Sequence, residues 1–335
     1  MTARLRRRHR LGIGIAAALC TTLVLSACGA GGNDTGSAGD TKKIFAFGYF
    51  PRNYNFVTQE WSEGFDQAKM ELGDRYDVEL QYEGTLDTDP GRYLNFIRTS
   101  MVQQPDGIVV IPNNSTAMTQ GLTQLQSQYR DVKILVMDQP VPNFNPVSYV
   151  GTENEKAGAQ AAEWMIDEHN TGKLESNKVA VFRNAPGSAS TDARLKGFLD
   201  AIKGTDLTVI KTVQPPDIRP ATSARMMADV LVANPDLGAV FSVSDTFGVG
   251  AAQAIVKAKS PAKQVSIDAS AEAVQAIIDG KGMQAAVAQH FSEMGHTAVM
   301  TLADALEGKS VEPIIDTGTT VVIKSNASDF LKTIQ

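Results

Sequence analysis

The sequence predicts an α/β fold of two similar lobes, each built on a doubly wound parallel sheet. Three observations support this. From residue 43 onward, short apolar runs alternate with longer segments of helical spacing, the βαβ pattern of a parallel sheet covered on both faces. The alternation occurs twice in succession, and a chain of 335 residues is long enough for two domains.

The first set of elements begins directly after Lys43. Two helices in this set are marked by apolar residues at helical spacing. The first carries Trp61, Phe65, Ala68, Met70 and Leu72, and the second carries Tyr93, Phe96, Ile97 and Met101. We expect the strands of this set near residues 44–49, 77–82, 107–111, 133–137 and 148–151.

A second set of the same kind follows. Its predicted strands lie near 178–182, 207–213, 238–242 and 263–267, and its helices near 154–168, 189–203, 221–233 and 246–258. The remaining pieces are a helix at 271–279, a strand at 284–289, a long helix at 291–307 and a last strand at 319–323. Ligands of such sheets bind outside the carboxyl ends of the strands, so two facing sheets would line one cleft.

The N-terminus has the layout of an export signal, with five arginines, then the apolar run Leu11–Leu25, then small residues before Cys28. Leu25-Ser26-Ala27-Cys28 resembles a bacterial lipoprotein lipobox, which implies cleavage before Cys28 and a lipid on its thiol. The alternatives are an ordinary secreted protein or an anchor helix, for which the apolar run is short. We expect a signal peptide over 1–27 and a lipidated cysteine with a flexible tether over 28–42.

Composition excludes several classes of protein. Cys20 lies inside the predicted signal, so no disulfide holds the mature fold together. Loss of the signal, with five arginines and no acidic residue, changes the net charge from −6 to −11 and makes nucleic acid an improbable partner. We find no phosphate loop, dinucleotide fingerprint, zinc-type histidine pair or serine elbow, and therefore expect no cofactor, no bound metal and no enzyme activity.

Several segments together resemble the type I periplasmic binding proteins of sugar ABC transporters, and among them the ribose-binding proteins most closely. The resemblance runs through nearly all of 43–335 and rests on Asn55-Phe56-Val57 with Gly64, Asp106–Val110, Ile134–Asp138, Val150–Asn154 with Gly158, Gly187–Arg194 with Gly197-Phe198, Asn234–Phe241, Ser244-Asp245, Ile267-Asp268 and Ala288-Gln289. The sequence departs from the family at Gln139 (usually arginine), Glu153 (usually aspartate), Ile218 (usually aromatic) and Ser244 (often asparagine).

The resemblance implies lobes joined by three hinge crossings near 152, 289 and 319, which close over a ligand. The N-terminal lobe would comprise 43–152 plus 290–319, and the C-terminal lobe 153–289 plus 320–335. It also implies a monomer that delivers a small sugar or polyol to an ABC permease and its ATPase. A sensory receptor for a sugar-derived signal such as autoinducer-2 is the main alternative, because Gln139 and Ile218 leave room for a different ligand.

The residue types at the strand ends suit a sugar, whose hydroxyls donate and accept and whose C–H face is apolar. We expect ligand contacts from Asn55, Phe56, Asp138, Gln139, Arg194, Ser244, Asp268 and Gln289. Structural roles remain open for most of them. Asp138 could start a turn, Arg194 could pair on the surface with Asp192 or Asp200, and Asp268 could cap a helix. Phe56 could belong to the core, Gln289 could bond only hinge backbone, and Asp245 could be a cap. We expect Arg194→Ala to abolish detectable binding with the melting temperature of the empty protein little changed. A parallel loss of both would mean that Arg194 is structural.

Overall fold

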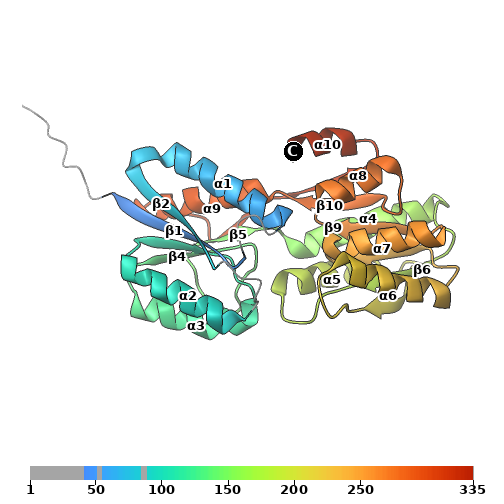
Figure 1. Ribbon diagram of the computed structural model, residues 1–335, viewed down its shortest axis with the longest axis horizontal. Helices are drawn as coiled ribbons and strands as arrows, with labels where there is room; N and C mark the ends of the chain where they lie inside the picture. The colour runs from blue at the N-terminus through green and yellow to red at the C-terminus, as the bar shows by residue number, and fades with distance from the viewer. Residues whose placement is uncertain (1–40, 51–54, 84–88, 335) are drawn as a thin grey trace, which may run out of the picture. The chain divides into compact units, whose positions relative to one another are not determined.

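The computed structural model describes residues 41–50, 55–83 and 89–334 (Figure 1). The predicted signal peptide, Cys28 and nearly all of the tether lie outside these residues. Within the described ranges, no helix combines the length and the apolar character needed to cross a bilayer. The body built from these residues contains two six-stranded sheets, as the repeated βαβ alternation predicts.

The first sheet has the strand order β11-β5-β4-β3-β1-β2, and every neighbouring pair is parallel. Helices α1 and α9 pack together on one face, and α2 and α3 pack on the other. The bounds are β1 Lys42–Gly48, α1 Phe56–Leu72, β2 Tyr76–Tyr82, α2 Pro90–Ser100, β3 Gly107–Val110, α3 Ser115–Gln128, β4 Lys133–Met137, β5 Tyr149–Gly151, α9 Phe291–Leu306 and β11 Ile314–Asp316, with 3-10 turns at Gly73–Arg75 and Met101–Gln103.

The second sheet has the order β12-β10-β9-β8-β6-β7, and only β12 runs antiparallel to its neighbour. Helices α4 and α5 pair, as do α6 with α7 and α8 with α10. The bounds are α4 Asn154–Asn170, β6 Lys178–Phe182, α5 Ala189–Ala201, β7 Thr208–Val213, α6 Pro220–Ala233, β8 Ala239–Ser242, α7 Asp245–Ala258, β9 Lys263–Ile267, α8 Ala271–Asp279, β10 Ala285–Gln289, β12 Thr319–Ile323 and α10 Ala327–Thr333.

Three short segments connect the two sheets. They join β5 to α4, β10 to α9 and β11 to β12, at residues 151–154, 289–291 and 316–319. Hydrogen bonds tie these segments together, among them Thr317 N to the carbonyl of Gly151 (2.9 Å) and His290 Nδ1 with the carbonyl of Thr317 (2.9 Å). The expected three hinge crossings are therefore present.

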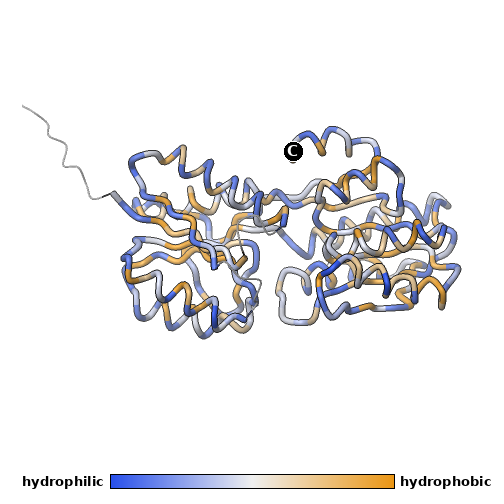
Figure 2. The backbone as a smooth tube through the Cα atoms, in the orientation of Figure 1, coloured by the Kyte–Doolittle hydropathy of each residue, from blue (hydrophilic) through white to orange (hydrophobic). Residues whose placement is uncertain are grey.

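Burial explains why the strands read as continuous apolar runs. In Figure 2 orange, which marks hydrophobic residues, is frequent along the strands of both sheets. Residues 134–137 and 179–182 are almost fully buried, because helices cover both faces of each sheet. Met70, by contrast, is exposed although it lies on the first predicted helix.

Close packing of α4 on α5 requires a glycine. A Cβ at Gly158 would lie 1.9 Å from the carbonyl oxygen of Arg194 and 2.9 Å from the backbone N of Phe198. The backbones of the two helices therefore touch at Gly158. This contact fixes the position of α5, the helix that carries Arg194.

Candidate ligand-binding site

A cavity of about 240 Å³ lies where the carboxyl-end loops of the two sheets meet. Both lobes contribute to its walls, and the residues from both are mainly polar or aromatic. The first lobe supplies Tyr49, Phe50, Asn55, Val57, Thr58, Trp61, Asn113, Asp138 and Gln139, together with Phe291 at the start of α9. The second supplies Asn184, Ser188, Ser190, Thr191, Arg194, Ile218, Ser244, Thr246, Asp268 and Gln289.

Asp138 and Asp268 occupy corresponding positions, each directly after a central strand of its own sheet, β4 and β9. Both adopt the left-handed backbone conformation, with φ of 65° and 73°. Aspartate tolerates this region better than most residues, and such conformations cluster at functional sites. Both side chains are buried at the cavity wall, so two carboxylates face the cavity from opposite lobes.

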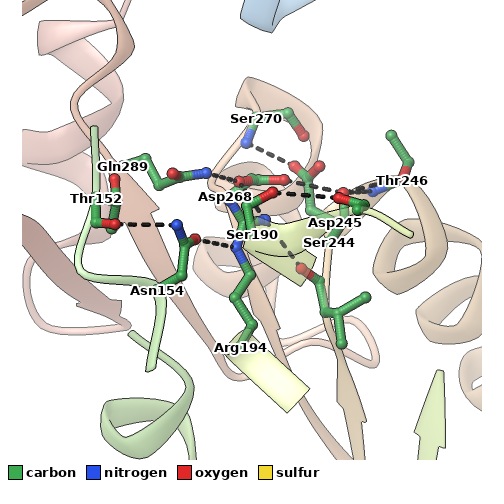
Figure 3. A network of polar contacts seen from close by, with 12 residues as sticks. Thr152, Asn154, Ser190, Arg194, Ser244, Asp245, Thr246, Asp268, Ser270 and Gln289 are labelled. Atoms are coloured by element: carbon green, nitrogen blue, oxygen red, sulfur yellow. Dashed lines mark hydrogen bonds and ion pairs between the residues drawn. The ribbon is translucent and has the colours of Figure 1, made fainter. Parts of the chain in front are cut away.

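Arg194 is held by three acceptors in the second lobe (Figure 3). Its Nε donates to Asn154 Oδ1 at 2.8 Å, and its NH1 donates to the carbonyl of Val243 at 3.1 Å and to Asp268 Oδ1 at 3.5 Å. The residue is only 4% exposed, so the alternative of a surface pair is wrong. Asp192 instead pairs with Arg183, and Asp200 with Lys196 and Lys203. The burial and the three bonds also give Arg194 a structural role, so its loss should lower the stability of the empty protein instead of leaving it unchanged.

Asp268 accepts hydrogen bonds from three neighbouring side chains (Figure 3). Besides Arg194, Gln289 Nε2 donates to its Oδ1 at 2.5 Å and Ser244 Oγ donates to its Oδ2 at 2.9 Å. The cap of the following helix is Ser270, whose Oγ accepts from Ala273 N, so Asp268 is not that cap. The predicted residues Arg194, Ser244, Asp268 and Gln289 thus form one connected group.

Asp245 lies behind this group rather than on the cavity wall. It is the first residue of α7, and its Oδ2 accepts from the backbone N of Ser270 at 2.8 Å. Burial raises the pKa of Asp245, and the nearby charge of Asp268 raises it further. Asp245 is therefore not the cap of α7, which is Ser244; its carboxylate instead ties the start of α7 to Ser270, the cap of α8.

The surroundings of Asp138 favour its neutral form more strongly than the surroundings of an exposed aspartate do. Burial raises its pKa to about 6, Arg194 lowers it, and Asp268 raises it. Glu60 on α1 behaves similarly. Burial raises its pKa to about 8, and the carboxylates of Glu63, Asp268 and Asp245 add to the effect. Acidic groups from both lobes thus lie within electrostatic range of one another.

The aromatic wall differs from the predicted one. Phe56 does not line the cavity, because its ring packs against the first-lobe core and meets Phe291 edge-on at 6.0 Å. Tyr49, Phe50, Trp61 and Phe291 line the cavity in its place. Asn55 does line it, and its Oδ1 also caps α1 by accepting from Thr58 N at 3.0 Å.

Gln139 makes contacts between the lobes. Its Oε1 accepts from Ser115 Oγ of its own lobe at 3.4 Å and from Ser188 Oγ of the other lobe at 3.3 Å. Beside it, the backbone N of Ala189 donates to Ser115 Oγ at 3.3 Å. These bonds join Gln139 and the first turn of α3 to the start of α5, so they connect the two lobes at one rim of the cavity.

Several lining residues were missed by sequence reasoning. Asn113 and Asn184 follow β3 and β6 closely, so the rule that ligands meet strand ends would have identified them. Trp61 lies more than one helical turn inside α1, where its apolar neighbours favoured a core assignment. Within the described part of the chain, no group of three or more His, Cys, Asp and Glu could hold a metal ion.

Comparison with known proteins agrees with this architecture. Residues 45–310, which are most of the chain, match the family described as periplasmic binding protein domain. The D-allose-binding periplasmic protein of Escherichia coli is 30% identical over 172 residues, which cover 51% of this chain and about half (54%) of that protein. The ribose import binding protein RbsB of Bacillus subtilis is 26% identical over 227 residues, covering 68% of this chain and 72% of that protein.

A solved structure has the same fold. The carbohydrate transporter solute binding protein from Agrobacterium radiobacter, in complex with D-arabinose, has a TM-score of 0.77 at 23% identity, with 89% of this chain and 99% of that chain covered. The two-lobed α/β architecture and the match over most of the sequence lead to one conclusion. The chain belongs to the periplasmic binding protein domain family.

Proposed function

We propose that this chain is the substrate-binding lipoprotein of an ABC importer, which captures a small sugar or sugar-like polyol between its lobes and delivers it to the permease. The observation that carries the proposal is the position of Asp138, Arg194 and Asp268, which line one cavity from two lobes. Charge-assisted hydrogen bonds contribute about 1.5–3 kcal/mol each, so three or four to ligand hydroxyls support micromolar binding after association costs.

The size of the cavity favours a monosaccharide-sized ligand. Its volume of about 240 Å³ is smaller than the roughly 300–1,000 Å³ typical of sites for drug-sized molecules. The curated relatives named above are binding proteins for ribose import and for D-allose, which favours transport over sensing. We therefore propose binding without chemical change of the ligand.

Hinge closure would supply the signal to the permease and its ATPase. A ligand that bonds Asp138 on one lobe and Arg194 and Asp268 on the other binds the closed form better than the open form. We propose that the protein is a monomer with two moving lobes. One lobe comprises residues 43–152 plus 290–319, and the other comprises 153–289 plus 320–335. Measurement of the molar mass by light scattering, with and without ligand, tests whether the protein is a monomer.

Isothermal titration calorimetry of the purified protein with a panel of pentoses, hexoses and polyols tests the binding function. We expect one or a few members to bind at micromolar concentration. The variant Asp138→Asn should weaken that binding at least tenfold, while Asp131→Asn, an exposed aspartate of the same lobe, should leave it unchanged. A panel without any binder, or equal affinity of the Asp138→Asn variant, contradicts the proposal.

Membrane attachment is a separate proposal that rests on the N-terminal sequence. We propose that residues 1–27 are removed, that Cys28 carries a lipid, and that the protein is anchored to the extracytoplasmic face of the cell membrane. Fractionation of cells expressing the full chain should place it in the membrane fraction, and Cys28→Ser should release it. A variant that stays in the membrane fraction would show that another feature holds it there.

A further inference from the structure

The indole N–H of Trp61 is a buried donor that has no acceptor. The residue is 4% exposed, and its Nε1 has no hydrogen-bond partner among the described residues. Its ring meets Tyr49 at 6.4 Å and Phe291 edge-on at 5.9 Å, and all three residues line the cavity. An unmatched buried donor is unfavourable, and such groups in native structures call for an explanation.

Polar neighbours on the same helix are already engaged. Thr58 Oγ1 donates to the carbonyl of Asn55 at 3.0 Å, and Ser62 Oγ donates to the carbonyl of Thr58 at 2.6 Å. Val57 and Thr58, which precede Trp61 by four and three positions, are short and lie on the same helical face. Trp61 lines the cavity together with these two residues.

Two further unmatched polar atoms belong to the same cavity. Asn184 Oδ1 and Gln289 Oε1 are buried acceptors with no hydrogen-bond partner among the described residues, and both residues line the cavity from the second sheet. The amide of Gln289 is fixed by its bond to Asp268, so its oxygen cannot be exchanged for the nitrogen without losing that bond. The indole N–H of the first lobe and the two amide oxygens of the second lobe thus have no hydrogen-bond partner among the described residues, and all three belong to residues that line the same cavity.

We infer that Trp61 is a ligand-binding residue whose indole N–H donates to an oxygen of the bound molecule, on the ligand face turned toward α1. The inference rests on the proposed function and specifies it further. The ligand is a polyol that carries a hydroxyl or ring oxygen at this face and hydroxyl donors toward Asn184 and Gln289. A deoxy compound that lacks the oxygen at this face is discriminated against, because the N–H would stay unmatched.

The substitution Trp61→Phe tests the inference, because it keeps an aromatic ring and removes only the N–H donor. The chain has two tryptophans, and the other, Trp164, lies on α4 and lines a different hollow. Trp164→Phe is therefore the matched control. Using the tightest-binding sugar of the panel, we expect Trp61→Phe to lower affinity about tenfold and Trp164→Phe to leave it unchanged. Thermal unfolding of the empty variants checks that both are folded.

Monodeoxy analogues of the same sugar locate the partner oxygen. For the wild type, one analogue should bind about tenfold more weakly than the parent sugar. For Trp61→Phe, the same analogue and the parent sugar should bind with equal affinity. In Trp164→Phe, whose only tryptophan is Trp61, ligand should change the emission of the indole. Equal affinity of Trp61→Phe and wild type, or no analogue with this coupling, overturns the inference. Failure of the whole panel to bind wild type contradicts the proposed function instead.

Discussion

Arg194 should contribute to stability as well as to binding, and Arg194→Ala measures both. The substitution removes donors to Asn154 Oδ1, to the carbonyl of Val243 and to Asp268, from a side chain that is almost completely buried. Removing one partner of a buried ion pair costs about 3–5 kcal/mol, because the remaining charge is left uncompensated. Asp268 keeps two neutral donors, Gln289 and Ser244, so we expect the lower end, about 3 kcal/mol.

Thermal unfolding of the empty protein, together with calorimetry of sugar binding, separates the two effects. At roughly 2–4 °C per kcal/mol for a large domain, the melting temperature should fall by about 6–12 °C. Arg219→Ala is the control, because Arg219 is largely exposed and its ion pair with Asp217 lies on the surface, so its loss should leave stability nearly unchanged. An Arg194→Ala variant as stable as wild type would refute the assignment of a structural role. Loss of stability with unchanged sugar affinity would refute a role in binding.

Three further outcomes are expected. Burial raises the pKa of Glu60 to about 8, and the carboxylates of Glu63, Asp268 and Asp245 raise it further. Because Asp268 and Asp245 belong to the opposite lobe, the closed, ligand-bound form takes up a proton and loses stability as pH rises from about 5 to 8. Sugar affinity should therefore fall about tenfold over this range in wild type and less in Glu60→Gln, and equal slopes in calorimetry would contradict the argument. Gly158→Ala should destabilise the protein by at least about 1–3 kcal/mol, because the new Cβ would lie 1.9 Å from a backbone oxygen of α5. Unfolding in urea measures this, and an unchanged urea midpoint would disprove the close contact. Gln139→Ala removes the hydrogen bonds from Ser115 and Ser188, so it should weaken sugar binding about fivefold. It should also increase the radius of gyration of the ligand-bound protein in small-angle scattering. An unchanged affinity and radius would show that the contacts at this rim are dispensable.

Local pattern was sufficient for most of the fold. Strands buried on both faces are continuous apolar runs, so their ends and the residues after them can be located without a structure. That is why Asp138 and Asp268 could be placed at the carboxyl ends of their strands. Among the missed elements are β11, with three residues, and α10, with seven, which are too short to show a period.

Contacts between distant segments had to come from the tertiary structure. The sequence alone determined the two α/β lobes and the identity of most polar residues at the strand ends, because these depend on burial patterns a few residues long. Only the tertiary structure decided that Arg194 is fastened by Asn154 and Asp268, and that Gln139 bonds across to Ser188. It also placed Trp61 instead of Phe56 at the cavity wall, because the phase of α1 against α9 selects which ring faces inward. Such choices depend on how separate elements pack, and no single segment of the chain contains that information.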